Sequence, residues 1–117
     1  MIVTEAHFEE YKAEVNRLVE LLGLKDWQIQ FTHTSFADCY AWINFSHADR
    51  IVVFGLATGI EERDVQAFNI SKYARHEVLE LLLADINTKL GNFGCKEKEI
   101  SSLLHAVIRR LEKLEVK

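Results

Sequence analysis

A chain of 117 residues, of which 49% are hydrophobic and 27% charged, is long and apolar enough for one globular domain with a sizeable core. Its formal charge of −4 argues against a nucleic-acid-binding surface, because such surfaces neutralise phosphates with many Lys and Arg side chains. No apolar run reaches the roughly 20 residues of a membrane span, and the first residues lack the basic and apolar regions of a signal peptide. We therefore expect a single domain over residues 1–117, in the cytosol, without nucleic-acid or membrane partners.

The chain begins with the pattern of an amphipathic helix. Apolar residues recur at helical spacing over residues 8–22. Thr4 suits the N-cap position, because its hydroxyl can accept a hydrogen bond from a free backbone N–H group of the first turn. Gly23 suits the end of the helix.

Three strands are predicted next. Residues 27–31 alternate between apolar and polar, residues 40–45 are rich in strand-forming side chains, and residues 51–54 form a short apolar run. The links between them, 34–38 and 46–50, are short enough for antiparallel hairpins.

The second half of the chain predicts two helices. A long helix is expected from about residue 71 to residue 90, and residues 91–94 interrupt it with two glycines. An apolar stripe between residues 100 and 114 predicts the last helix. The order αβββαα describes an α+β fold, with a small antiparallel or mixed sheet packed on helices.

The most specific motif lies in the long predicted helix. His76 and Glu80 are four residues apart, so they lie one turn apart on the same face and could hold one metal ion. In the zincin pattern H-E-x-x-H, the Glu activates a water molecule at the metal, and here that role would belong to Glu77. Glu80 stands where the pattern has its second His, so the motif is HExxE.

This layout, with the motif on the helix that follows a small sheet, resembles the minimal zincin-like metallopeptidase family of bacteriophages and prophages, related in layout to the SprT-like proteins. The resemblance covers nearly the whole chain. It is carried by residues 26–29, 41–54, 76–83 and 105–111, of which only 76–83 is chemically specific.

The resemblance implies a function for four residues. His76, Glu80 and His105 match the three metal ligands, and Glu77 matches the general base. The family usually has His at the second ligand position and often Glu at the third, so this chain carries the two types in exchanged positions. The set still contains two imidazoles and one carboxylate, which is used by catalytic zinc with water in the fourth position. The implied cofactor is Zn²⁺, and the implied substrate or partner is a peptide or protein.

Each of these residues also has a structural interpretation. Glu80 could be a solvated charge on an exposed helix face, and His105 could be an ordinary surface residue. Glu77 could pair with Lys72 or Arg75.

Other potential ligands lie near the predicted sheet. His33, Cys39 and His47 have suitable side chains, but their positions fit no known ligand spacing. With no secretion signal, Cys39 and Cys95 are expected to be reduced thiols rather than a disulfide.

Aromatic residues of the strands could line a substrate groove or belong to the core: Trp27, Tyr40, Trp42 and Phe54. Tyr73, one turn before His76, could stabilise an oxyanion or simply pack. In folds of this kind the strand bordering the active helix can add an extended peptide to the sheet, so residues 51–54 or the neighbouring strand could do so here.

Two functions follow from the sequence. The first is a zinc metallopeptidase, a hydrolase that cleaves peptide bonds with a zinc-activated water. The second is a catalytically inactive, phage-encoded zincin-like protein that acts as a protein-binding module. The imperfect motif favours the second, because a carboxylate ligand in place of an imidazole makes the zinc less electrophilic. The sequence carries no signal for an oligomeric state.

Overall fold

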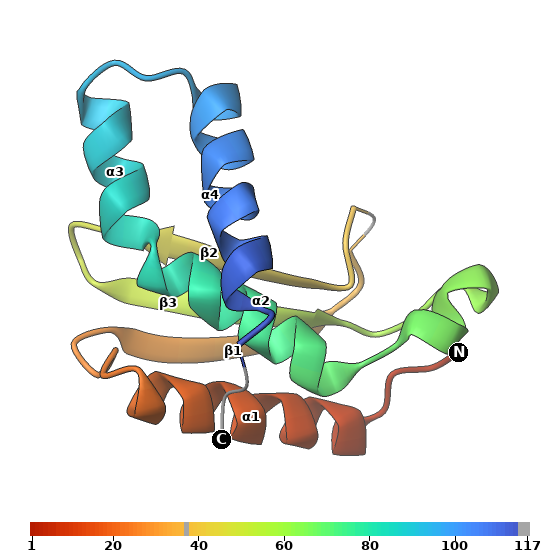
Figure 1. Ribbon diagram of the computed structural model, residues 1–117. Helices are drawn as coiled ribbons and strands as arrows, with labels where there is room; N and C mark the ends of the chain where they lie inside the picture. Colours follow the sequence, from red (N-terminus) through yellow and green to blue (C-terminus); the bar gives the residue numbers. More distant parts are fainter. Residues whose placement is uncertain (37, 115–117) are drawn as a thin grey trace.

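The computed structural model describes residues 1–36 and 38–114, and it places a three-stranded sheet against helices (Figure 1). The elements, in chain order, are α1 (Glu5–Leu21), β1 (Gln28–Thr34), β2 (Ala41–Ser46), β3 (Ile51–Ala57), the 3₁₀ helix η1 (Glu62–Ala67), α2 (Ile70–Leu82), α3 (Ala84–Asn92) and α4 (Glu97–Leu111). The predicted α+β class with a small sheet is confirmed. No helix in the described part of the chain combines the length and the apolar character of a membrane-spanning segment.

The first helix begins and ends where the sequence predicts. The Thr4 hydroxyl accepts a hydrogen bond from the backbone N–H of His7 at 3.3 Å, and the His7 ring accepts one from the backbone N–H of Thr4 at 3.0 Å. Gly23 has a φ of +70°, a conformation that glycine adopts without steric cost. This reciprocal cap fixes the start of α1, and the glycine lets the chain turn towards β1.

The strands are not arranged as two successive hairpins. The sheet order is β1-β3-β2, with β1 parallel to β3 (Gln28 opposite Ile51) and β2 antiparallel to β3 (Ala41 opposite Leu56). The hairpin predicted for the link 46–50 is confirmed. The hairpin predicted for the link 34–38 is wrong, because β3 lies between β1 and β2.

Burial explains why the last strand takes the central position. Val52, Phe54 and Leu56 of β3 are fully buried, and the remaining positions of this strand are at most partly exposed. Polar side chains alternate along β1, as in Gln28 and Gln30, and both are exposed. A nearly continuous apolar strand is most stable with a partner on each edge and helices on a face, whereas an alternating strand suits an edge.

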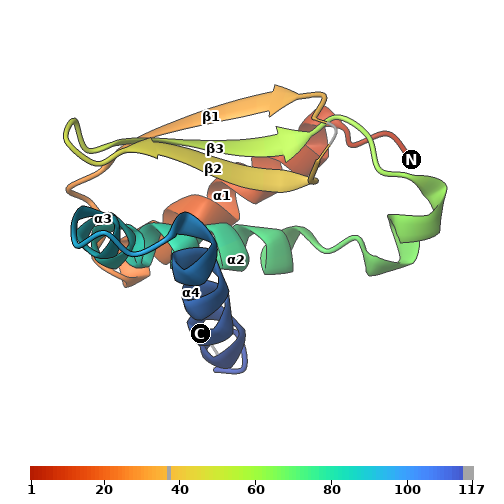
Figure 2. The same ribbon diagram turned by 90° about the horizontal axis from the view of Figure 1, so that it is seen from above.

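The helices α1 and α2 lie on the same face of the sheet (Figure 2). Between them and the strands lies the main core, whose largest fully buried side chains include Tyr11, Leu18, Phe54 and Leu81. On the opposite face the Trp42 ring lies directly over Gly55, so closely that a Cβ atom at this position would overlap the indole. The ring stacks on Phe36 with a centroid distance of 4.7 Å.

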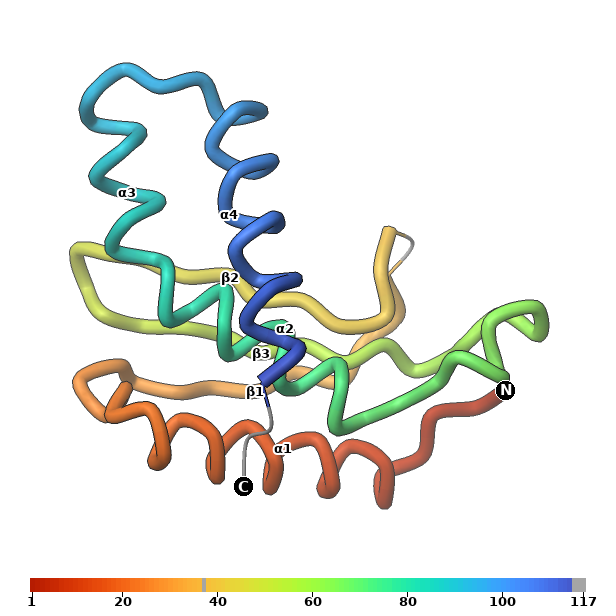
Figure 3. The backbone as a smooth tube through the Cα atoms, in the orientation of Figure 1, coloured from red at the N-terminus to blue at the C-terminus, as the bar shows by residue number. Residues whose placement is uncertain are grey.

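The long helix predicted over residues 71–90 is two helices. The chain bends at Leu83, which has φ −92° and ψ 5°, and α3 then forms an antiparallel hairpin with α4 (Figures 1 and 3). Leu81 and Ala84 belong to the main core, whereas Leu79 and Leu83 belong to a second cluster with α4. The bend lets neighbouring residues contribute to two separate apolar clusters.

Candidate metal centre

The second apolar cluster brings α4 against the end of α2. It consists of Leu79 and Leu83 with Ile100, Leu104 and Ile108 of α4, all buried. These α4 residues recur at helical spacing, so they form one stripe that faces α2. His105 follows Leu104 directly, so the packing of the stripe carries its ring towards α2.

His76, Glu80 and His105 meet at this contact between the two helices. The distance between His105 Nε2 and Glu80 Oε1 is 3.1 Å, and that between His76 Nε2 and the same oxygen is 3.8 Å. The two imidazole rings are 5.7 Å apart between centroids. Each residue offers one ligand atom, and these atoms all lie within 4.8 Å of one another.

This donor set fits a zinc ion. Zinc bonds of about 2.0–2.1 Å to nitrogen and oxygen place the ligand atoms of a tetrahedral site roughly 3.4 Å apart. The separations given above require side-chain movements of no more than about 1.5 Å to reach that geometry. All three side chains are half-buried, so they are accessible to an ion from solvent while their rotamers are restricted by the helix contact.

Two further contacts orient the imidazoles. His105 Nδ1 lies 2.8 Å from the backbone oxygen of Ser101, so an N–H at Nδ1 donates to this carbonyl and the Nε2 atom faces Glu80. His76 Nδ1 lies 3.5 Å from Oε2 of the half-buried Glu112. Such partners on the second ring nitrogen are typical of metal-binding histidines.

Glu112 was not among the residues predicted from the sequence. It follows His105 by seven residues, so the two lie two turns apart on one face of α4, but a Glu at the end of a helix has no distinctive pattern. Only the crossing of α4 over α2 reveals its proximity to His76.

Glu77 lies beside the cluster and points into the protein. It is 5% exposed and is the only buried charged side chain among the described residues. Burial raises its pKa above the ordinary range, and the negative charges of Glu80 and Glu112 raise it further. Within the described residues it forms no ion pair with Lys72 or Arg75, so that structural interpretation is wrong.

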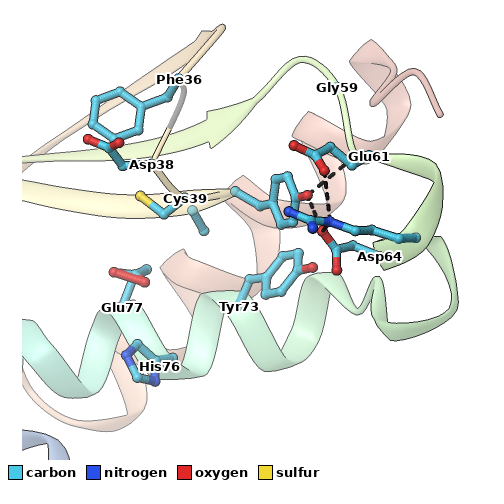
Figure 4. Close-up of a pocket in the computed structure, with 12 residues that line it drawn as sticks. Phe36, Asp38, Cys39, Gly59, Glu61, Asp64, Tyr73, His76 and Glu77 are labelled. Atoms are coloured by element: carbon cyan, nitrogen blue, oxygen red, sulfur yellow. Dashed lines mark hydrogen bonds and ion pairs between the residues drawn. The ribbon is translucent and has the colours of Figure 1, made fainter.

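A cleft with a volume of about 660 Å³ opens next to His76 and Glu77 (Figure 4). Its walls come from the segment before β2, from the segment around η1, and from the first half of α2. The Tyr40 hydroxyl donates to the Asp64 carboxylate, and Arg63 Nε lies 2.8 Å from Glu61 Oε2 and 3.7 Å from Asp64 Oδ2. The Tyr40–Asp64 hydrogen bond ties the η1 segment to the start of β2, and the Arg63 contacts lie within the η1 segment.

A smaller pocket of about 260 Å³ lies on the other side of the three candidate ligands His76, Glu80 and His105. Glu80 and His105 contribute to its wall, as do Ile43 and Phe45 of β2. The apolar residues of the second cluster complete most of its lining: Leu83, Ile100, Leu104 and Ile108. The candidate metal centre therefore lies between two cavities.

The other potential ligands lie elsewhere. His33 stacks on Phe8 with a centroid distance of 4.8 Å, and its Nε2 is buried without a hydrogen-bond partner in the described structure. His47 Nε2 pairs with Asp85 at 2.8 Å. Cys39 lines the cleft opposite Glu77 (Figure 4), and burial, followed by the charge of Glu77, raises its thiol pKa.

The predicted aromatic residues lie in the core, in the cleft and, for Trp42, on the opposite face of the sheet. Trp27 and Phe54 are buried in the main core. Tyr40 and Tyr73 line the cleft, and the Tyr73 ring also packs edge-on against Phe68 with a centroid distance of 5.8 Å. Both cysteines, Cys39 and Cys95, are free thiols, as the sequence predicts.

Comparison of the chain with protein-family models, with curated proteins and with solved structures found no match. The case for a metal centre therefore rests on the donor atoms of the chain itself. These are two imidazoles and one carboxylate from two helices, with an orienting contact on each ring and a buried Glu beside them.

Proposed function

We propose that this protein is a zinc-dependent peptidase of the minimal zincin-like type. In this proposal His76, Glu80 and His105 hold the ion and Glu77 is the general base. The observation that carries it is the convergence of the three donor atoms within 4.8 Å, although one of the ligands is 25 or more residues from the others in the chain. Bound zinc would supply Lewis acidity at the substrate carbonyl and would lower the pKa of a water molecule.

In this proposal Glu77 would move the proton. Its carboxylate would accept a proton from the attacking water and pass it to the amine that leaves when the peptide C–N bond breaks. The raised pKa of the buried carboxyl favours proton uptake, and a cation at the neighbouring cluster would oppose this effect by stabilising the carboxylate. The two imidazoles would be held in orientation by the Ser101 carbonyl and by Glu112.

The strand β2 is the best candidate to bind an extended peptide. The sequence-based suggestion that residues 51–54 do so is wrong, because both edges of β3 are paired. The neighbouring strand remains: within the described sheet β2 pairs on one side only, and its residues line both cavities at the candidate centre. A peptide added there would lie alongside the ligands.

A second function, the inactive zincin-like binding module, is favoured by a different observation. Ion-pair contacts join Glu80 to His105 at 3.1 Å and Glu112 to His76 at 3.5 Å, and these contacts involve no metal ion. Such a network could simply hold α4 against α2, and the cavities would then serve binding alone.

Zinc content and hydrolysis together distinguish these functions. Protein purified without chelator should contain one equivalent of zinc and should cleave a fluorogenic casein substrate. Glu77→Gln should keep the zinc and lose hydrolysis, because an amide cannot act as a base, and His76→Ala should lose both. The matched control is His47→Ala, which removes an imidazole far from the cluster and should change neither.

The contrary outcomes are equally specific. A wild-type protein without zinc, and without zinc uptake at micromolar concentrations, would favour the binding module. Hydrolysis that survives Glu77→Gln would show that the proposed general base is wrong.

A further inference from the structure

The two cavities beside the candidate centre differ in chemical character. The cleft next to His76 and Glu77 is lined by charged and polar side chains, with Asp38, Glu61 and Asp64 among them. The pocket next to Glu80 and His105 has six aliphatic or aromatic residues in its lining, and its other polar residues are Asn87 and the exposed Glu97 and Ser101. A molecule that crosses the centre therefore meets a mostly polar and acidic lining on one side and a more apolar lining on the other.

The strand β2 connects the two cavities in a fixed order. Tyr40 and Ala41, at its start, line the cleft, whereas Ile43 and Phe45, further along, line the pocket. The helix α2 follows the same order, because its first half borders the cleft and its last turn, with Glu80, borders the pocket. An extended segment along the outer edge of β2 advances about 3.3 Å per residue, so four or five residues span both cavities.

The cleft suits a cationic side chain. Its acidic residues Asp38, Glu61 and Asp64 outnumber its one basic residue, Arg63, and the pairs with Arg63 occupy Glu61 and Asp64. Asp38 is exposed and takes part in no ion pair within residues 1–36 and 38–114. Figure 4 shows its side chain beside the Phe36 ring, across the cleft from Glu61 and Asp64, and its exposure leaves it accessible to a Lys or Arg side chain.

The pocket suits an apolar side chain. A cavity of 150 Å³ lined by aliphatic and aromatic residues can hold a benzene molecule, so a pocket of about 260 Å³ has room for a Leu or Phe side chain. Burial of such a side chain in the pocket favours binding, because it removes apolar surface from water. Half-buried Asn87, on α3, is part of the pocket lining.

We propose that this site recognises an extended peptide with an apolar side chain on the amino side of the metal centre and a Lys or Arg side chain on the carboxyl side. The order follows from antiparallel pairing, the more stable arrangement, because β2 runs from the cleft towards the pocket and an antiparallel peptide runs from the pocket towards the cleft. The position of the cleaved bond between the two side chains rests on the proposed peptidase function. The recognition itself requires only the cavities and β2.

Peptide binding to the Glu77→Gln protein loaded with zinc tests this inference without cleavage. The probes are two fluorescein-labelled octapeptides of identical composition, one with Leu residues before and Arg residues after a central Gly-Gly, and one with this order reversed. Fluorescence anisotropy should give at least tenfold tighter binding for the first peptide. Equal affinities, or tighter binding of the reversed peptide, would overturn the proposal.

Two further variants, made in the Glu77→Gln protein, test which cavity produces the preference for Arg and which produces the preference for Leu. Asp38→Lys should weaken binding of the first peptide at least fivefold and should favour a version with Glu in place of Arg. Asn87→Phe should fill the pocket and remove the preference for Leu over Ala while the preference for Arg persists. The control Glu10→Lys places the same charge change on the exposed face of α1 and should leave both preferences intact.

The outcome for recognition can be separated from the outcome for hydrolysis. If the wild-type protein cleaves casein but the variants leave peptide preference unchanged, the cavities do not select the substrate and this inference is wrong. If the preferences follow the variants but the wild-type protein cleaves neither casein nor the first peptide, the recognition stands and the peptidase function is wrong.

Discussion

Replacement of Glu77 by Gln should stabilise the metal-free protein, and the gain should grow with pH. The folded state raises the pKa of Glu77 above its ordinary value of 4.5, mainly through burial, so above pH 4.5 the folded state binds more protons at this residue than the unfolded state. The free energy of unfolding therefore falls as pH rises through this window, by up to about 1.4 kcal/mol per pH unit. Gln has no such dependence.

The magnitude follows from the distance between the working pH and 4.5. At pH 7 the contribution from this residue has an upper limit of about 3 kcal/mol, and it approaches zero near pH 4.5. Urea unfolding in the presence of EDTA at pH 5, 6, 7 and 8 would measure the difference between the wild type and Glu77→Gln. Saturating zinc should reduce the gain, because a cation at the cluster stabilises the carboxylate.

An exposed Glu on α4 provides the matched control. Glu99→Gln removes one negative charge without changing a buried group, so its effect should be small and nearly independent of pH. If Glu77→Gln destabilises the metal-free protein at pH 7, or changes stability equally at pH 5 and pH 8, the buried carboxyl does not have a raised pKa and our interpretation of its environment is wrong.

Three other changes have defined outcomes. Glu80→His and His105→Glu should each shift the zinc affinity, measured by competition with a chromophoric chelator. The zinc affinity of the double exchange should be closer to that of the wild type. Additive effects of the two changes would mean that the two residues share no ion. Gly55→Ala should cost about 1–3 kcal/mol and alter the fluorescence of Trp42, because its Cβ would overlap the indole; unchanged emission would contradict this packing. Ile108→Ala should lower the free energy of unfolding in urea by about 2–4 kcal/mol and should also weaken zinc binding, because Ile108 is buried in the second apolar cluster, which positions α4. Unchanged zinc affinity would show that this packing does not position the zinc ligands.

Local patterns predicted most elements of this fold, but not how they pair. The cap at Thr4, the stop at Gly23 and the positions of the three strands follow from short-range chemistry, and all are confirmed. The parallel pairing of β1 with β3 depends on which strand is buried deepest in the assembled core. The link 34–38 is short enough for a hairpin, so its length predicted the wrong pairing of β1 with β2. The bend at Leu83 had no Gly or Pro signal, because it arises from packing against two clusters.

The candidate site was predictable where helical spacing or the family resemblance applied. Spacing alone placed His76 and Glu80 on one face of a helix, and the resemblance selected His105, which does lie with them. Neither source pointed to Glu112 or to the division of the site between an acidic and an apolar cavity. These features depend on how α4 crosses α2 and on which face of β2 meets the helices.

The separation of the apolar residues into two clusters has a consequence for motion. The main core joins α1, the sheet and α2, whereas α4 is attached through the second cluster and through the polar contacts at the candidate centre. We expect the α4 side of the α3–α4 hairpin to open without global unfolding, so its amides should exchange with solvent before those of β3. An ion that bridges α2 and α4 would suppress this opening. Above the dissociation constant, each tenfold increase in free zinc concentration would add about 1.4 kcal/mol to the protection of α4. Amide exchange in this hairpin would therefore report metal occupancy directly, even in a variant that performs no chemistry.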